Sequence, residues 1–198
     1  MSRVAFVVDE MFEDAELRVP YDRIRQAGHE VVLVGREAGK RLEGEKKKEH
    51  VETEAAIADV EPEDFDALVI PGGYSPDHLR VDAQVVDFVR DLVDGGKPVA
   101  AVCHAGSLLV EANVVSNRTV TSWPSIRTDL INAGAHWVDR AVVEDGNLIT
   151  SRRPDDLSVF SDAILRQLEG RIPPRVQPSK PAEGDGENID FDADVPIH

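Results

Sequence analysis

A cysteine followed directly by a histidine is the pair of side chains in this sequence best suited to covalent chemistry. Cys103 and His104 come immediately after the apolar segment 98–102, and residues 104–112 have the character of a helix. In a parallel sheet, ligands bind beyond the carboxyl ends of the strands, and a nucleophile on a strand-to-helix turn is exposed there. The positive end of the following helix favours the thiolate, so we expect a lowered thiol pKa and a nucleophilic Cys103.

Each member of this pair also has a structural interpretation. A single cysteine is often a buried core residue with no chemical role. Adjacent side chains usually point in different directions, so His104 could be a partly exposed residue of the first helical turn. Its functional interpretation is a general base, or a cation that supports the thiolate.

Two further groups are expected at the same edge of the sheet. Gly72 and Gly73 end the buried segment 66–70, and their N–H groups, together with that of His104, could form an oxyanion hole. Glu13 follows the first apolar segment. A carboxyl and a thiolate do not both ionise readily in a dry site, so we expect Glu13 to keep a proton and donate it in a hydrogen bond to sulfur. Its alternative role is to favour the helix dipole.

The elements that position these residues alternate between strand and helix, which predicts an α/β fold with a mostly parallel sheet. Two apolar segments flank the tripeptide Asp145-Gly146-Asn147, which indicates a hairpin. The charged run 45–49 is interpreted as a solvated hairpin tip. Strands are expected at 3–8, 30–34, 66–70, 98–102 and 119–122, the hairpin strands at 141–144 and 148–150, and helices at 14–26, 83–93, 104–112, 126–133 and 155–168.

Composition predicts a globular domain at residues 1–170 followed by an acidic, proline-rich tail at 171–198 that is disordered. The formal net charge of −16 disfavours nucleic acid and anionic membranes as partners. One cysteine permits no internal disulfide, and no signal peptide is evident, so a cytoplasmic location is expected. The six histidines lack ligand spacing, so no metal is expected. No cofactor is expected either, because chemistry at a cysteine thiolate needs none.

Taken together, these features resemble the ThiJ/PfpI family across about residues 3–169. The resemblance implies a flavodoxin-like three-layer sandwich of the class I glutamine amidotransferase type. The matching segments are 12–17 (FEDAEL), 65–73 (FDALVIPGG), 96–104 (GKPVAAVCH), 129–134 (DLINAG) and 151–157 (SRRPDDL).

The resemblance also assigns roles to residues. It implies Cys103 as nucleophile, His104 beside it, Glu13 as the carboxyl partner, and Asp77 as an acid that completes the site of a neighbouring subunit. Homo-oligomers, dimers or hexamers built from them, are therefore expected. Two positions depart from the family pattern: Asp77 stands where relatives often have Glu, which shortens its reach, and Ala105 stands where glycine is common, which narrows the pocket.

The predicted function is that of a cysteine-dependent hydrolase. Its substrates would be 2-oxoaldehydes, their adducts on proteins, or small peptides, so peptidase, deglycase and glyoxalase activities remain open, in a stress-protective role. The alternative is a non-catalytic oxidative-stress sensor or chaperone that uses oxidation of Cys103. A glutamine amidotransferase is disfavoured because segment 151–156, where a triad histidine is expected, contains none.

Overall fold

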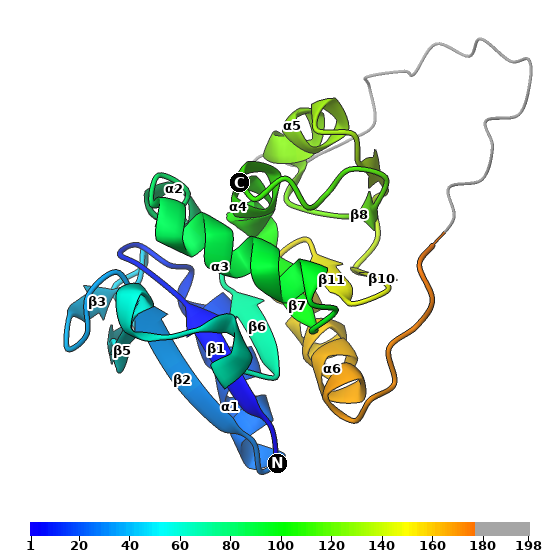
Figure 1. The fold of residues 1–198 in the computed structure, drawn as a ribbon. Coiled ribbons are helices and arrows are strands. Elements are labelled where there is room, and N and C mark those ends of the chain that lie inside the picture. Colours follow the sequence, from blue (N-terminus) through cyan, green and yellow to red (C-terminus); the bar gives the residue numbers. More distant parts are fainter. Residues whose placement is uncertain (177–198) are drawn as a thin grey trace, which may run out of the picture.

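The computed structural model describes residues 1–176, which form an α/β fold around one central sheet (Figure 1). Within these residues the sheet has seven strands in the order β10-β11-β7-β6-β1-β2-β5, and only β10 runs antiparallel to its neighbour. The predicted mostly parallel sheet is therefore confirmed. Its strands are β1 (Arg3–Val7), β2 (Glu30–Gly35), β5 (Ala55–Ala56), β6 (Ala67–Ile70), β7 (Val99–Val102), β10 (Val142–Asp145) and β11 (Leu148–Ser151).

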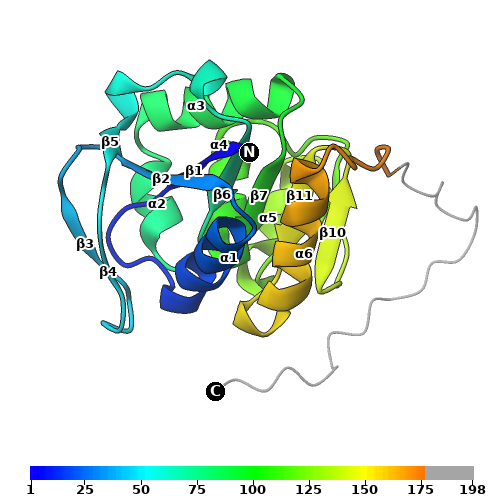
Figure 2. The ribbon, with the colours of Figure 1, turned by 90° about the horizontal axis from the view of Figure 1, so that it is seen from below.

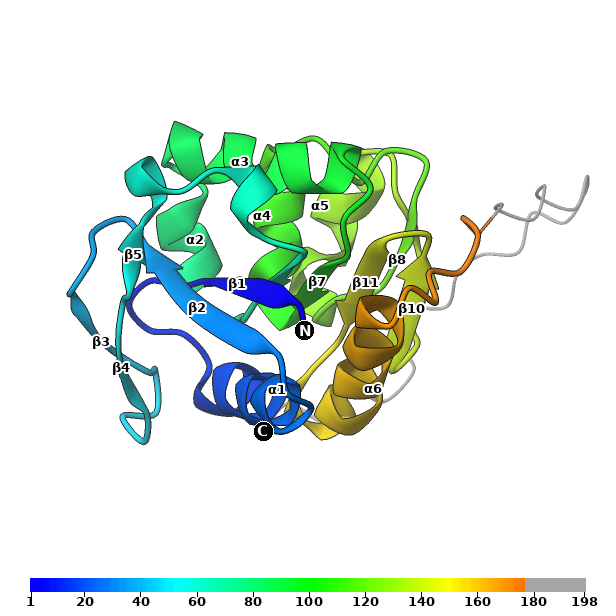
Figure 3. The same cartoon turned by 60° about the horizontal axis from the view of Figure 1, so that its bottom comes forward.

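Helices cover both faces of the sheet, because successive side chains of its buried strands point to opposite sides. In β1, Val4 and Phe6 pack in one hydrophobic cluster, whereas Ala5 and Val7 pack in another. Helices α1 (Asp14–Gln26) and α6 (Leu157–Leu168) cover the first face together, as Figures 2 and 3 show. The opposite face is covered by α3 (Ala83–Asp94) and α4 (Gly106–Glu111).

Smaller elements surround the sheet. The predicted hairpin around the charged run is formed by β3 (Arg41–Glu43) and β4 (His50–Glu52). The expected strand at 119–122 is shorter, because β8 (Thr119–Val120) pairs with β9 (His136–Trp137) in a separate two-stranded sheet. The remaining helices are α2 (Ser75–Leu79), which was not predicted, and α5 (Arg127–Asn132).

The predicted tail lies mostly outside the described residues. Its first residues contact the domain: the Val176 N–H donates to Asp145 Oδ1 at 3.0 Å, and Arg175 donates to the Asn117 carbonyl at 2.6 Å. No helix within residues 1–176 is both long enough and apolar enough to cross a membrane.

Candidate active site

Cys103 occupies the predicted junction between a strand and a helix. Strand β7 ends at Val102, and residues Cys103–Ala105 form a 3-10 turn that leads into α4. The backbone of Cys103 has a φ of 62°, a left-handed value that side-chain-bearing residues seldom adopt and that costs about 1–3 kcal/mol. This sharp turn places the thiol of Cys103, a residue that is 8% exposed, in the wall of a cleft.

The cleft has a volume of about 630 Å³ and brings the predicted catalytic side chains together. Cys103, His104, Glu13 and Asp77 all line it. Its other walls come from the β3–β4 hairpin tip, from α1, α2 and α4, and from the segments around the starts of α5 and α6. These walls contribute Glu16, Glu45, Lys46, Gly73, Tyr74, Arg80, Ser107, Trp123, Ile126, Asp129 and Pro154.

The carboxyl group that interacts with the Cys103 thiol belongs to Glu16, and the prediction of Glu13 for this contact is wrong. Glu13 is the N-cap of α1, so its carboxylate turns back along the helix and accepts from the Glu16 N–H at 2.8 Å. Its other oxygen accepts from Lys46 Nζ at 2.5 Å. Because both oxygens of Glu13 are engaged, it is Glu16, one helical turn further along α1, that interacts with the Cys103 sulfur.

Gly72 holds Glu16 in place, so it is not the oxyanion donor that was predicted. Its N–H donates to Glu16 Oε2 at 2.9 Å, and its carbonyl accepts from the Glu13 N–H at 3.1 Å. A Cβ on this residue would lie 2.5 Å from Glu16 Oε2 and 2.8 Å from Cys103 Cβ, so only glycine fits between the two side chains. The thiol instead receives the backbone N–H groups of Gly73 and His104.

Both ring nitrogens of His104 have partners. Nδ1 lies 3.3 Å from Cys103 Sγ, so the adjacent residues do form a Cys–His contact. Nε2 lies 3.0 Å from Ser125 Oγ, in the loop before α5, and the Trp123 ring lies beside the imidazole with its centroid 6.4 Å away. Burial lowers the pKa of His104, which favours the neutral ring near neutral pH.

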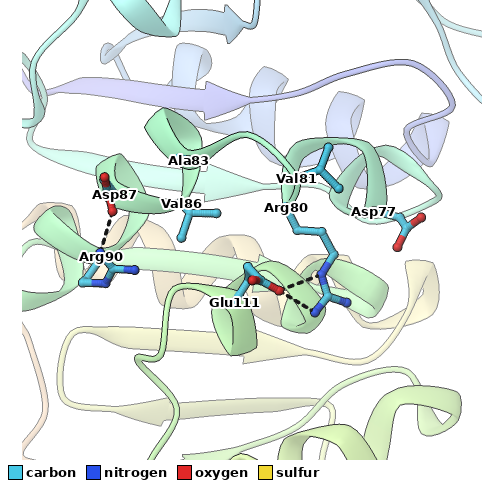
Figure 4. A pocket seen from close by; sticks show the side chains of 8 residues that line it. All are labelled: Asp77, Arg80, Val81, Ala83, Val86, Asp87, Arg90 and Glu111. Carbon is cyan, nitrogen blue, oxygen red and sulfur yellow. Dashed lines mark hydrogen bonds and ion pairs between the residues drawn. The ribbon is translucent and has the colours of Figure 1, made fainter.

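Asp77 lies on α2, exposed in the cleft wall. Figure 4 shows its carboxylate apart from the neighbouring pair of Arg80 and Glu111, which hydrogen-bond to each other at 2.9 Å. Within residues 1–176, the side chain of Asp77 has no hydrogen bond or ion pair. The imidazole of His104 in the same chain contacts Ser125 and not Asp77.

Burial governs the protonation of the thiol and its carboxyl partner. Glu16 is fully buried, and burial together with the Glu13 charge raises the pKa of Glu16 to about 8. Burial also raises the pKa of the Cys103 thiol, and an ionised Glu16 raises it further, while the N–H groups of His104 and Gly73 oppose the shift. The expected lowering of the thiol pKa is therefore not found, because desolvation outweighs the backbone donors.

The predicted solvated hairpin tip is part of the site, and this prediction is corrected. The buried Asp14 carboxylate accepts the N–H groups of Lys46, Lys48 and Glu49 at 2.7–2.9 Å. Burial alone would raise the pKa of Asp14, but these hydrogen bonds outweigh it and lower that pKa. They fasten the tip over the start of α1, where Glu45 and Lys46 form one wall of the cleft.

Sequence reasoning missed Glu16, Lys46 and Ser125. A signal existed for the first: an acidic residue at the cap position, followed by Glu three positions later, resembles a capping box. That pattern identifies Glu13 as the capping residue. The Glu13 N–H donates to the Gly72 carbonyl and not to Glu16, so Glu16 is free for another partner. The other two depend on contacts between segments distant in the sequence, and no local pattern points to them.

The chain is similar to known proteins over most of its length. The model of the DJ-1/PfpI family matches residues 2–167. The chain is 45% identical over 167 residues to protein/nucleic acid deglycase 2 of Escherichia coli, covering 84% of this chain and 97% of the relative. It is 42% identical over 168 residues to general stress protein 18 of Bacillus subtilis, covering 84% and 98%.

A solved structure shows the same fold. The crystal structure of Drosophila melanogaster DJ-1beta superposes with a TM-score of 0.79 at 31% identity, covering 86% of this chain and 92% of that one. The strand-to-helix cysteine lies in a domain that matches this family over nearly its whole length. The chain therefore belongs to the DJ-1/PfpI family.

Proposed function

We propose that this protein is a cysteine-dependent hydrolase of the deglycase and glyoxalase type, acting on 2-oxoaldehydes and their adducts. The observation that carries the proposal is that several polar groups converge on the sulfur of Cys103. The buried Glu16 carboxyl, the imidazole of His104 and two backbone N–H groups all meet the Cys103 thiol inside a cleft. The deglycase similar to this chain supports the assignment.

The carboxyl group of Glu16 supplies what the thiolate needs. Glu16 Oε1 is buried and has no hydrogen-bond partner among the described residues, whereas Oε2 is held by Gly72. A buried oxygen without a partner is costly unless it carries a proton that another group accepts. With its pKa raised to about 8, Glu16 stays mostly protonated at neutral pH, and its O–H stabilises the thiolate of Cys103.

The remaining groups fit a balanced reaction. The thiolate adds to the aldehyde carbon, forming a C–S bond and an alkoxide that accepts the N–H groups of Gly73 and His104. The imidazole moves the proton from the former aldehyde carbon to the neighbouring one, which yields a thioester. Water then hydrolyses the thioester to a 2-hydroxy acid and restores the thiolate. In a hemiaminal or hemithioacetal adduct, the imidazole takes the hydroxyl proton and passes it to the carrier amine or thiol. The bond to the carrier breaks, the aldehyde C=O re-forms, and the thiolate then adds to it.

A homo-oligomer is part of the proposal. Asp77 is exposed in the cleft wall, and its side chain has no partner within residues 1–176. We propose that, in a dimer or a hexamer built from dimers, this carboxylate reaches His104 of a second copy. The Asp77→Asn variant should then lower kcat while leaving the mass in solution unchanged, as measured by light scattering.

The test of the activity follows both methylglyoxal loss and lactate formation. Unmutated protein should form lactate in proportion to the aldehyde lost, and Cys103→Ala should form none. Peptidase assays with short peptides run in parallel, because the same sulfur chemistry acts on amides. Equal lactate formation by the two proteins would refute the assignment of the nucleophile.

A redox role for the same cysteine is the second candidate, and the partnerless oxygen of Glu16 favours it. A protonated carboxyl beside the sulfur would hydrogen-bond to an oxygen of a sulfinate and so stabilise that oxidation state. Intact mass after mild peroxide should then show two added oxygens in unmutated protein and fewer in Glu16→Leu. An unchanged mass at low peroxide would rule the sensor out.

A further inference from the structure

The cations in the wall of the active-site cleft are already engaged. Lys46 Nζ lies 2.5 Å from Glu13 Oε1, so that ammonium and carboxylate neutralise each other. Arg80 donates to Glu111 Oε2 through Nη2 at 2.9 Å and through Nε at 3.3 Å, as Figure 4 shows. Neither cation is therefore free to bind an anionic group of a substrate.

The free charge of the cleft is negative. Three lining residues have carboxylates without any hydrogen bond or ion pair within residues 1–176: Glu45, Asp77 and Asp129. Glu16 stays mostly protonated at neutral pH, and burial keeps the imidazole of His104 mostly neutral, so neither offsets these charges. A ligand in this cleft therefore meets an excess of negative charge.

Glu45 is the unpaired carboxylate that acts on the reacting pair. Its charge raises the pKa of Glu16, which interacts directly with the thiol. The backbone of Glu45 is held in place, because its N–H donates to the Phe12 carbonyl at 2.8 Å and the N–H of the next residue, Lys46, donates to Asp14. A charged side chain that lines the cleft from an anchored backbone is well placed to select among substrates.

The surroundings of Glu45 favour a cation as its missing partner. Burial raises the pKa of Glu45, and the charges of Glu13 and Asp14 raise it further, whereas Lys46 lowers it. A carboxylate crowded by two others is stabilised when a ligand brings positive charge.

We infer that Glu45 is a specificity-determining residue that makes the cleft select carbonyl substrates carried on cationic groups, as in lysine- and arginine-rich peptide segments, over substrates bearing phosphates. This inference rests on the proposed function. The relative named protein/nucleic acid deglycase includes both kinds of carrier in its name. The formal net charge of −16 acts in the same direction, because it repels polyanions from the whole surface.

The first test measures the sign of the potential at the sulfur and needs no enzymatic activity. The chain has a single cysteine, so methanethiosulfonate reagents report on Cys103 alone. The thiolate attacks the sulfenyl sulfur, a disulfide forms, and methanesulfinate leaves. We compare a trimethylammonium reagent with a sulfonate reagent, each rate being divided by its rate with free 2-mercaptoethanol. The corrected ratio should favour the cationic reagent by ~5-fold or more and fall toward one at high salt.

Variants then assign the effect to one residue. Glu45→Gln should reduce the ratio ~3-fold or more, and Glu45→Lys should reduce it further. Glu52→Gln is the matched control, because it removes the same charge from the same hairpin. The Glu52 side chain does not line the cleft, so the rate ratio should stay unchanged in this variant. A ratio near one in unmutated protein, or equal ratios in unmutated protein and Glu45→Gln, would overturn the inference. The salt dependence of unmutated protein decides the sign of the potential even if a variant does not fold.

The second test uses turnover. Methylglyoxal adducts are formed on the cysteine of two short peptides that differ only in flanking lysines or glutamates, and on a guanine nucleotide. We expect kcat/KM for the lysine peptide to exceed that for the glutamate peptide and for the nucleotide, and Glu45→Gln to narrow the gap. Equal kcat/KM values would overturn the inference while leaving the proposed function intact. Absence of any Cys103-dependent turnover would refute the proposed function. The corrected ratio of the two methanethiosulfonate rates would still test the charge selection in that case.

Discussion

Replacing Glu16 by glutamine tests the buried carboxyl through protein stability. Glu16 is fully buried, its Oε2 accepts from the Gly72 N–H, and burial raises its pKa from an ordinary value of 4.5 to about 8. Glutamine has nearly the same shape, accepts the same hydrogen bond and does not titrate. Both proteins in the comparison carry Cys103→Ala, so that only one titratable group of the pair remains.

The sign follows from the direction of the shift. The folded protein keeps the Glu16 proton up to about pH 8, whereas the unfolded chain releases it near its ordinary pKa. Stability from this group is therefore full below the unfolded pKa and is lost as the pH rises toward the folded pKa. Each pH unit in that window costs about 1.4 kcal/mol. Between about pH 5 and about pH 7.5, the protein that retains Glu16 should thus lose roughly 3 kcal/mol of stability relative to the Glu16→Gln variant.

Urea unfolding, followed by far-ultraviolet circular dichroism at a series of pH values, measures this difference. The two stability curves should diverge steadily with pH, and the glutamine variant should be relatively more stable at the alkaline end. A Glu52→Gln control, which removes an exposed carboxylate, should show the same pH dependence of stability as its parent. Parallel curves for the Glu16 pair would mean that Glu16 ionises normally, and the proposed proton donor to the thiolate would fail with it.

Three further changes probe the supports of the site. Lys46→Met should raise the pH midpoint of Cys103 alkylation by iodoacetamide, because Glu13 is left unneutralised beside Cys103 and Glu16. The free energy of unfolding in urea should change by less than about 1 kcal/mol, since the Lys46 side chain is 51% exposed. Gly72→Ala should destabilise the fold by about 1–3 kcal/mol in the same unfolding assay, because its Cβ would lie 2.8 Å from that of the nucleophile. Ser125→Ala should lower kcat ~5-fold with little change in KM, because the imidazole loses a 3.0 Å contact that orients it, and equal kcat values would contradict that role.

The arrangement of the sheet was predictable because each of its main elements has a local signal. The helix expected at 14–26 has those bounds in the structure, since apolar side chains recur along one face and glycine follows its end. The strand ending at Val102 and the hairpin around Gly146 likewise follow from short apolar segments bounded by turn residues. The position of Cys103 at the junction of a strand and a helix was placed correctly because it depends only on the order of these elements.

The carboxyl partner was not predictable from that order. Glu13 and Glu16 are one helical turn apart at the same edge of the sheet, so both are close to the nucleophile. The choice between them depends on the cap: Glu13 bonds the Glu16 N–H and Lys46, and this leaves Glu16 for Gly72 and the sulfur. The ion pair in that choice joins residues 33 positions apart, which periodicity cannot show.

The hairpin tip was misjudged for a related reason. A run of charged residues between two short strands is usually solvated, and Lys47 and Lys48 are indeed exposed. The tip is nevertheless drawn to the site by the Asp14 carboxylate, whose three backbone donors lie 32–35 positions away. The pattern of the run is local, whereas its position depends on an acid in another element.

The packing at the first turn of α1 explains why Glu16 retains its proton. It places three buried acids within four residues: Glu13, which pairs with Lys46; Asp14, which holds the hairpin; and Glu16, which meets the sulfur. The first two are compensated by a cation or by backbone donors. Glu16 has one backbone donor and a like charge nearby, so retaining its proton is the remaining way to avoid a buried, uncompensated charge. The packing of the first helix thus places a carboxyl group with a raised pKa beside the Cys103 sulfur, as the proposed proton donor to the thiolate requires.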